Sequence, residues 1–298
     1  MTAQRDRWRV ATESEHSAQA SQSRVTAHFE VESPRWETIY EANDVVAVIH
    51  QRRLAMALSW VDALRLPVGT PVLELGCGAG LASVALAERG FSVQATDVVD
   101  AMMERAHERV QRAGLADRVR IERADAHELP FADGSFDLVM ALGVLPWLHS
   151  PARAAGEMAR VLRPDGFLIA TIGNRLRLPW LVDPLFAPAL TGLRGALKRT
   201  LRRLGKPWRS PLEPHTHPLD VKQWRALLSD TGFHVVRSTT FGFGPFTLLG
   251  REFLPDRTSV SLDRQLQELA DRQIAVVRST GAQHIALARK QTSREELT

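Results

Sequence analysis

Several features that would define other classes of protein are missing from this sequence. Its 298 residues include one cysteine, Cys77, so an internal disulfide and a cysteine-based zinc site are both excluded. No uninterrupted apolar run reaches the roughly 20 residues that a membrane-spanning helix needs. The first residues are charged and lack an apolar core, which argues against a signal peptide. We therefore expect a cytoplasmic location.

The remaining composition is that of a globular protein with a mild excess of basic residues. Hydrophobic residues make up 44% of the chain and charged residues 24%, and the formal net charge is +4. Nucleic acid is not an expected partner, because no recognisable binding module accompanies this charge. Residues 1–33 are polar and show little periodicity, so we predict a disordered or flexible N-terminal segment. Residues 34–298 are predicted to form a single domain.

Strand-like and helix-like patterns alternate along much of this domain. Strand-like segments occur at residues 71–75, 92–96, 119–122, 136–141, 167–172, 235–240 and 285–288. This alternation predicts an α/β fold, a Rossmann-like doubly wound sheet that is mostly parallel and carries helices on both faces. The alternation stops twice. We interpret residues 174–218 as a helical lid insertion and residues 243–282 as a second insertion.

A glycine-rich turn joins the first predicted strand to the helix that follows it. The turn consists of Gly76, Cys77, Gly78, Ala79 and Gly80. Glycine permits positive φ angles and lets backbone N–H groups approach a nucleotide-like ligand. A dinucleotide-binding turn has the spacing G-x-G-x-x-G, whereas this turn has G-x-G-x-G. Glu74 would also repel a pyrophosphate, so a nicotinamide-dependent oxidoreductase is the less favoured alternative.

Residues 74–80, Glu-Leu-Gly-Cys-Gly-Ala-Gly, resemble the first motif of the class I S-adenosylmethionine-dependent methyltransferases. Residues 129–137 are similar to that family's stretch before its fourth strand, and residues 161–167 to its turn into the fifth. The resemblance covers about residues 36–173. It implies that the cofactor is S-adenosylmethionine.

The resemblance also implies roles for two aspartates. Asp97 ends the second predicted strand and would accept the ribose hydroxyls, while Asp125 follows the third and would contact the adenine. Taken alone, each carboxylate is more often a cap than a ligand. Their positions at the ends of successive parallel strands favour the ligand interpretation. The other residues expected to contact the cofactor are Glu74, Gly76, Cys77, Gly78, Gly80, Val98, Ala126 and Leu142.

The acceptor site is less well specified by the sequence. Trp147 stands in the loop where many relatives carry a histidine, and we expect it to wall an apolar acceptor together with Trp180. The candidate catalytic residues are His149, Tyr40 and His217. Ordinary structural roles remain open for all three, as a helix-start residue, a packing residue and a loop residue. No metal is expected, because no carboxylate cluster accompanies His217.

Residues 190–204 combine a stripe of leucines with arginines and a lysine, which predicts an amphipathic helix. The favoured interpretation is a lid whose leucines cover the acceptor pocket. Peripheral contact with an anionic membrane surface and docking to an acidic carrier protein are the alternatives.

The sequence thus predicts a methyltransferase that acts on a small-molecule or lipid-like natural-product acceptor by in-line displacement. Besides the oxidoreductase, the alternatives are a methyltransferase for a membrane lipid or nucleic acid and a non-catalytic binding protein of the same fold.

Overall fold

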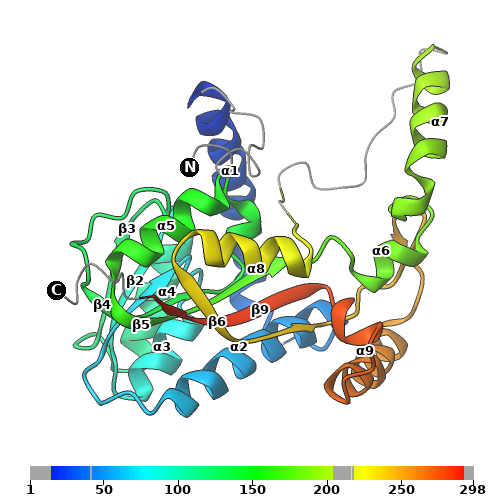
Figure 1. Cartoon of the computed structure of the whole chain (residues 1–298). Helices are drawn as coiled ribbons and strands as arrows, with labels where there is room; N and C mark the ends of the chain where they lie inside the picture. The colour runs from blue at the N-terminus through cyan, green and yellow to red at the C-terminus, as the bar shows by residue number, and fades with distance from the viewer. Residues whose placement is uncertain (1–14, 41, 204–215, 217, 292–298) are drawn as a thin grey trace.

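The computed structural model describes residues 15–40, 42–203, 216 and 218–291 (Figure 1). Within these ranges the centre is a seven-stranded sheet of order β3-β2-β1-β4-β5-β9-β6. Its strands are β1 (Pro71–Leu75), β2 (Ser92–Asp97), β3 (Val119–Arg123), β4 (Phe136–Ala141), β5 (Leu162–Gly173), β6 (Phe233–Phe241) and β9 (Gln283–Lys290). A separate hairpin is formed by β7 (Thr247–Leu248) and β8 (Arg251–Glu252).

The predicted doubly wound, mostly parallel sheet is confirmed. Strands β3, β2, β1, β4 and β5 pair in parallel, while β9 is antiparallel to both of its neighbours, β5 and β6. From β1 the chain winds outward through β2 to β3 and then returns to place β4 on the other side of β1. The strand order therefore reverses between β1 and β4, which is where ligands bind in sheets of this kind.

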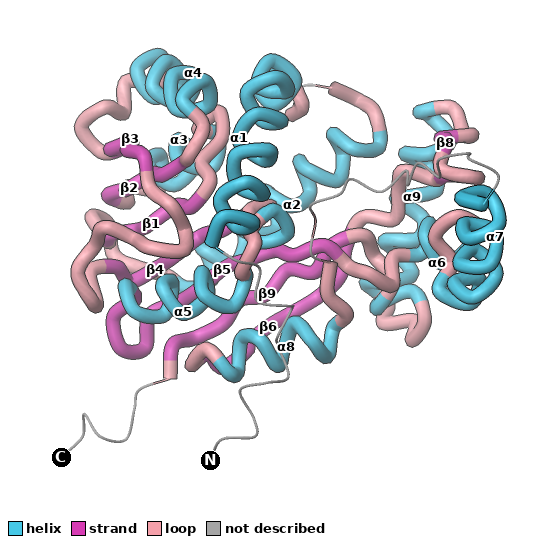
Figure 2. The backbone as a smooth tube through the Cα atoms, turned by 90° about the horizontal axis from the view of Figure 1, so that it is seen from above, coloured by secondary structure: helices cyan, strands magenta, loops and turns pink. Residues whose placement is uncertain are grey.

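Helices cover both faces of the sheet, as Figure 2 shows: α2, α3 and α4 lie on one face, and α5 and α8 on the other. Their bounds are α2 (Val45–Leu64), α3 (Leu81–Glu88), α4 (Asp100–Arg112), α5 (Pro151–Val161) and α8 (Val221–Asp230). Alternate strand residues supply the two cores. Leu73 and Val139 belong to the core beneath α5 and α8, and Val72 and Leu138 to the core beneath α2 and α3.

Local capping fixes the helices that carry the site. The Asp44 carboxylate accepts a hydrogen bond from the Ala47 N–H at 2.8 Å and so begins α2. Ser150 caps α5 in the same way, with Pro151 at the first helical position. Both helices therefore begin at a residue whose side chain caps the first turn.

The predicted disorder of residues 1–33 is wrong for residues 15–33, because α1 spans Glu15–Thr38 and runs across the expected domain boundary at residues 33 and 34. Val25 is 5% exposed, and the Phe29 ring lies 4.9 Å from the Trp147 ring. These contacts involve residues more than 100 positions away. A polar local composition holds no signal of them.

The first insertion is helical, as predicted. It forms α6 (Leu178–Val182), a short 3-10 turn (Pro188–Leu190) and α7 (Thr191–Arg203). Figure 1 shows α7 standing away from the sheet, and Leu193 is 68% exposed. That this insertion closes as a lid stays a prediction.

The second insertion contains α9 (Asp256–Asp271) and the β7–β8 hairpin. The sequence did not reveal the hairpin. Asp183, at the end of α6, is fully buried and ties this hairpin to the first insertion. Its carboxylate accepts hydrogen bonds from the Thr247 hydroxyl at 2.8 Å and the Gly250 N–H at 2.9 Å. The two insertions are thus one structural unit. None of the described helices is both long and apolar enough to cross a membrane.

Candidate active site

A cavity of about 750 Å³ opens where the strand order reverses. The glycine turn and the ends of β2 and β3 form one end, and helices α1 and α2 with the two insertions form the other. Most of the residues predicted from the sequence line it. They are Tyr40, Glu74, Gly76, Cys77, Gly78, Asp97, Val98, Asp125, Ala126, Leu142, Trp147 and Trp180.

The glycine turn depends on backbone conformations that side chains would obstruct. Gly76 has φ +64°, and a Cβ there would lie 2.3 Å from Val144 Cγ2. Gly78 has φ +52° and open space beside it. Gly80 does not line the cavity; a Cβ there would lie 3.0 Å from the Ala106 backbone in α4. Gly80 therefore serves close helix packing rather than the predicted cofactor contact.

Asp97 connects the end of β2 to the glycine turn. Its Oδ2 accepts the Gly78 N–H at 2.9 Å, and its Oδ1 accepts the N–H groups of Val98 and Val99 at 2.8 and 3.0 Å. Burial raises the pKa of this carboxyl, and the three backbone bonds act against that rise. A carboxylate has about four acceptor sites, so three backbone bonds leave one, on Oδ2, for a ribose hydroxyl.

Two further titratable groups lie beneath the turn. Glu74 is 4% exposed and accepts a hydrogen bond from the Ser83 hydroxyl. Burial, with a smaller contribution from Asp97, raises the pKa of Glu74 to about 8 although the Ser83 bond opposes it. Burial also raises the pKa of the Cys77 thiol. Cys77 is therefore an inert thiol at neutral pH, and Glu74 is mostly protonated there.

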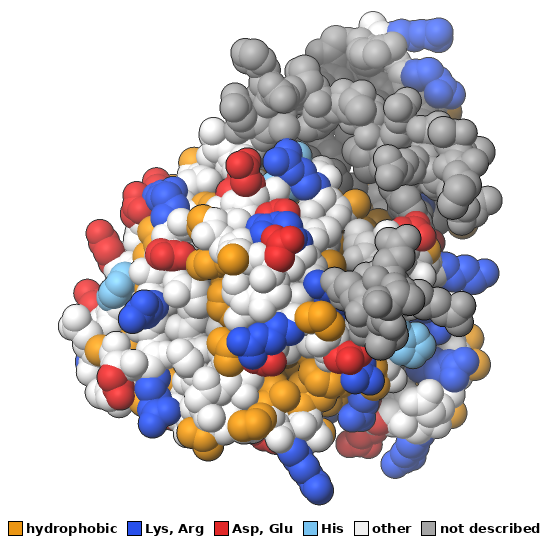
Figure 3. Space-filling model, turned by 60° about the vertical axis from the view of Figure 1, so that its left-hand side comes forward, with side chains coloured by type: hydrophobic (Ala, Val, Ile, Leu, Met, Phe, Trp, Pro, Cys, Tyr) orange, Lys and Arg blue, Asp and Glu red, His pale blue; other side chains and the backbone are white. Residues whose placement is uncertain are grey.

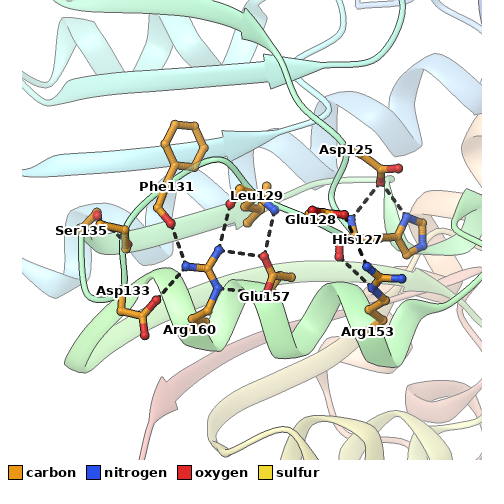
Figure 4. Close-up of polar contacts among 11 residues, drawn as sticks. Asp125, His127, Glu128, Leu129, Phe131, Asp133, Ser135, Arg153, Glu157 and Arg160 are labelled. Carbon is orange, nitrogen blue, oxygen red and sulfur yellow. Dashed lines mark hydrogen bonds and ion pairs between the residues drawn. The ribbon is translucent and has the colours of Figure 1, made fainter.

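The end of β3 places Asp125 at the edge of the cavity (Figure 4). Asp125 Oδ1 accepts hydrogen bonds from the His127 N–H at 2.9 Å and from His127 Nδ1 at 2.7 Å, and these bonds lower the pKa of Asp125. The His127 ring stacks on His149 with 3.7 Å between centroids. His149 supports this turn from behind and does not line the cavity.

Helix α5 holds the loop between β3 and β4, as Figure 4 shows. The Arg160 guanidinium donates to the carbonyls of Leu129 and Phe131 at 2.8 and 2.7 Å and pairs with Asp133 at 2.8 Å. Glu157 accepts the Leu129 N–H at 2.8 Å, and its pKa is lowered chiefly by Arg160. Residues 129–137, one of the stretches that suggested the family resemblance, are thus a loop that α5 holds in place next to Asp125.

An aromatic wall closes the opposite end of the cavity. It consists of His28, Phe29 and Trp36 from α1, Tyr40, His50 from α2, and Trp147 from the 3-10 turn Leu145–Trp147. Trp147 stacks on His28 at 5.6 Å and meets Phe29 edge to face at 4.9 Å. Trp36 contacts His50 at 5.1 Å. We refer to these six residues as the aromatic wall.

Sequence reasoning missed most of the aromatic wall. Phe29 and Trp36 lie seven residues apart, which is one face of a helix, and that spacing was the available signal. Trp180 was identified, and it stacks on Phe186 at 5.4 Å with the Arg177 guanidinium 3.5 Å from its ring. Tyr40 is the predicted catalytic candidate that the structure brings to the cavity. His217 lies outside the described residues. No group of three potential metal ligands occurs in the described ranges.

Comparison with known proteins identifies the class of this site. Residues 73–170 match the methyltransferase domain family. The chain is 42% identical over 110 residues to methyltransferase GfsG of Streptomyces halstedii, covering 36% of this chain and 39% of that protein. It is 35% identical over 165 residues to the 27-O-demethylrifamycin SV methyltransferase of Amycolatopsis mediterranei (strain S699), covering 55% and 56%.

A solved structure shows the same fold. Magnesium protoporphyrin IX methyltransferase from Synechocystis PCC 6803, determined with bound SAH, superposes with a TM-score of 0.58 at 18% identity, covering 91% of this chain and 100% of that one. Residues 73–170 are a methyltransferase domain. The doubly wound sheet, the glycine turn and the acid that ends β2 agree with the resemblance to class I S-adenosylmethionine-dependent methyltransferases. The aligned regions span about half of the lengths of the two sequence relatives or less.

Proposed function

We propose that this protein transfers the methyl group of S-adenosylmethionine to a small apolar natural-product acceptor by in-line displacement. The observation that carries the proposal is that one cavity joins the glycine turn to the aromatic wall. A donor on the turn and an acceptor on the wall would share a space with little water. Fixed geometry and exclusion of water supply much of the rate of such a transfer.

The residues divide into two sets. The glycine-turn N–H groups, Asp97 and Asp125 would hold the methionine, ribose and adenine parts of the donor, and the cofactor supplies an electrophilic methyl group when bound. Trp147 and Trp36 offer flat apolar surfaces to an acceptor. The names of the two sequence relatives, a rifamycin-type methyltransferase and GfsG, support an acceptor of natural-product type. Neither of these relatives supports the alternative that the protein is an oxidoreductase.

His50 is the proposed proton acceptor for a nucleophile that must lose a proton. Its Nδ1 lies 2.8 Å from the Val46 carbonyl oxygen, and this contact fixes the orientation of the ring. The ring lines the cavity. Tyr40, its neighbour in the aromatic wall, is proposed to help cover the donor.

The test is to incubate the full chain with S-adenosylmethionine carrying a labelled methyl group and an extract of apolar metabolites. Mass spectrometry should find one labelled product, which the Asp97→Ala variant fails to form. Absence of S-adenosylmethionine binding by isothermal titration would refute the proposed function.

We further propose that the joined insertions contact an anionic membrane surface. Arg199 and Arg203 of α7 are exposed, and exposed apolar side chains occur on α6, on α7 and in or next to the hairpin of the same joined insertions. These apolar residues are Val182, Leu193, Leu248, Leu249 and Phe253. Trp180 and Thr247, from the same elements, line the cavity. An apolar acceptor could thus enter from the lipid side.

Figure 3 shows acidic and basic side chains interspersed over the described surface of the face that it draws. Sedimentation with phosphatidylglycerol vesicles, compared with phosphatidylcholine vesicles, tests the membrane contact. Binding should be selective for the anionic vesicles and lost in Arg199→Glu/Arg203→Glu. The matched double variant Arg112→Glu/Arg120→Glu, at exposed positions elsewhere, should still bind. Equal sedimentation with both lipids would contradict the proposal.

A further inference from the structure

Gln283 brings to the cavity an amide whose oxygen has no hydrogen-bond partner among the described residues. It is the first residue of β9 and lines the cavity beside Ala282. Its Oε1 is buried. The large majority of buried side-chain polar atoms in proteins have a partner, so this oxygen is an exception that needs a physical reason.

Gln267, a buried glutamine on α9, shows the contrast. Its Oε1 accepts the Gly242 N–H at 3.1 Å, and its Nε2 donates to Asp271 at 2.9 Å. Both ends of that amide are used within the protein, to hold the residue after β6 against α9. At Gln283 no described group takes up the amide oxygen. A glutamine of this kind at a cavity indicates a partner that arrives with a ligand.

The backbone that carries Gln283 is fixed on both sides. Gln283 pairs with Gly173 of β5 and with Phe241 of β6. The Asn174 side chain donates to the Gly281 carbonyl at 2.7 Å, and a Cβ on Gly281 would lie 2.6 Å from the Phe241 nitrogen. The start of β9 therefore cannot shift to find the amide a partner. The last torsion of a glutamine side chain is broad, so rotation can present either end of the amide to the cavity.

The surroundings of Gln283 place it on the acceptor side of the cavity. Gly173 and Pro218 both line the cavity and lie against each other, and neither has a side chain that can hydrogen-bond. In the sheet β9 is two strands beyond β4. At a strand spacing of about 4.8 Å, Gln283 lies roughly 10 Å from the reversal of strand order. The amide thus faces the part of an acceptor that is remote from the methyl group in transfer.

We propose that Gln283 binds a hydroxyl group on the methyl acceptor. The inference rests on the proposed function and makes its acceptor an apolar molecule that carries a hydroxyl away from the methylated atom. A hydroxyl can donate to Oε1 and accept from Nε2, so it fits the amide in either orientation, whereas a carboxylate cannot donate. A ligand without a hydrogen-bonding group would displace the water of the cavity and leave the amide unpaired. A site with a buried polar group rejects such a ligand for this reason.

Isothermal titration with two small probes tests this preference. Protein saturated with S-adenosylhomocysteine is titrated with 3-phenylpropan-1-ol and with propylbenzene, which lacks only the hydroxyl. The ratio of the two affinities, alcohol over hydrocarbon, should be roughly 10-fold higher in wild type than in Gln283→Leu, the effect of one hydrogen bond in a site without water. Gln283→Asn, which keeps the amide on a shorter side chain, should retain part of the difference. A ratio within one variant cancels any general loss of stability.

Gln94→Leu is the matched control, because the Gln94 amide in β2 also has a buried atom without a described partner, Nε2, but Gln94 does not line the cavity. It should keep the wild-type ratio. An equal ratio in wild type and Gln283→Leu would overturn the hydroxyl site, and so would absence of binding by both probes in wild type. The methyltransferase proposal would stand in either case.

Failure of S-adenosylmethionine itself to bind would refute the proposed function instead. The two probes on the protein without S-adenosylhomocysteine would then decide the Gln283 site by the same comparison of ratios.

Discussion

The two ends of the cavity are built in different ways. At the proposed donor end, Gly76, Gly78, Asp97 and Asp125 all lie within residues 76–125, at the ends of three successive strands, and backbone N–H groups hold Asp97 in place. At the acceptor end, the walls come from α1, α2, the 3-10 turn after β4 and two insertions, and side chains make the contacts. A site built from backbone groups can bind the same ligand in proteins of many different sequences. A site built from side chains can change its ligand when one residue is substituted.

Asp97→Ala should produce the largest loss at the donor end. It removes a charged acceptor from the ribose and also the carboxylate that holds the Gly78 N–H. We expect affinity for S-adenosylmethionine to fall roughly 100-fold, as loss of a charge-assisted bond in an ordered site predicts. Isothermal titration measures it. Asp100→Ala, an exposed carboxylate that pairs with Arg123, should bind the donor as wild type does.

A result in which both variants bind equally well would remove Asp97 from the donor site. The cavity would then have to hold its ligand mainly through the aromatic wall, and the contrast between the two ends would fail.

Gly76→Ala and Gly78→Ala separate stability from binding within the glycine turn. The Gly76 change adds a methyl group 2.3 Å from Val144 Cγ2 and strains a positive φ, so we expect a cost of about 1–3 kcal/mol. The Gly78 change meets no atom within 4 Å and should cost less. Thermal melting of both variants checks the order, which a lower melting temperature for Gly78→Ala would contradict.

Trp147→Ala tests the acceptor end, because Trp147 contacts both His28 and Phe29 of α1. Loss of two aromatic pairs should raise the equilibrium constant for detachment of α1 from the domain by roughly 10-fold. The affinity for S-adenosylmethionine should change less than about threefold. Trypsin cleavage after Arg24 reports the opening. Trp180→Ala, which contacts Phe186 instead, should leave that cleavage rate unchanged.

An unchanged cleavage rate in Trp147→Ala would show that α1 is held by other contacts. A large loss of donor affinity in that variant would show that the two ends are not independent.

The donor end could be predicted because its chemistry is local. Asp97 and Asp125 follow strands recognisable from a few residues, and the turn between Gly76 and Gly80 is fixed by spacing. Gly80 shows where this reasoning fails. Its spacing fits the motif, yet its conformation serves packing against Ala106, which lies in another element.

The acceptor end could not be predicted because its neighbours are distant in sequence. Phe29 meets Trp147 across more than 100 residues, and Asp183 binds the hairpin at Thr247. Arg53 lies in the middle of α2, and its burial depends on Gly143, which follows β4. A charged residue among others on a helix is usually solvated, so the pattern alone favours the wrong interpretation.

The last prediction concerns pH and the buried Glu74 at the donor end. Its pKa is about 8 when folded, against an ordinary value of 4.5. Between these values the folded protein holds a proton that the unfolded chain has released. The stability contributed by this group is therefore full below about pH 4.5 and is lost as pH rises through 8.

Glu74→Gln should remove this dependence, because glutamine can still accept the Ser83 hydroxyl and carries no charge to bury. Between pH 5.5 and pH 8.5 the melting temperature of wild type should fall more steeply than that of the variant. Each kcal/mol of unfolding free energy that wild type loses should lower its melting temperature by roughly 2–4 °C. Glu104→Gln, an exposed position on α4, should retain the wild-type slope. Parallel slopes in wild type and Glu74→Gln would mean that Glu74 is already ionised in the empty turn. The donor end would then carry a permanent negative charge beneath the glycine turn.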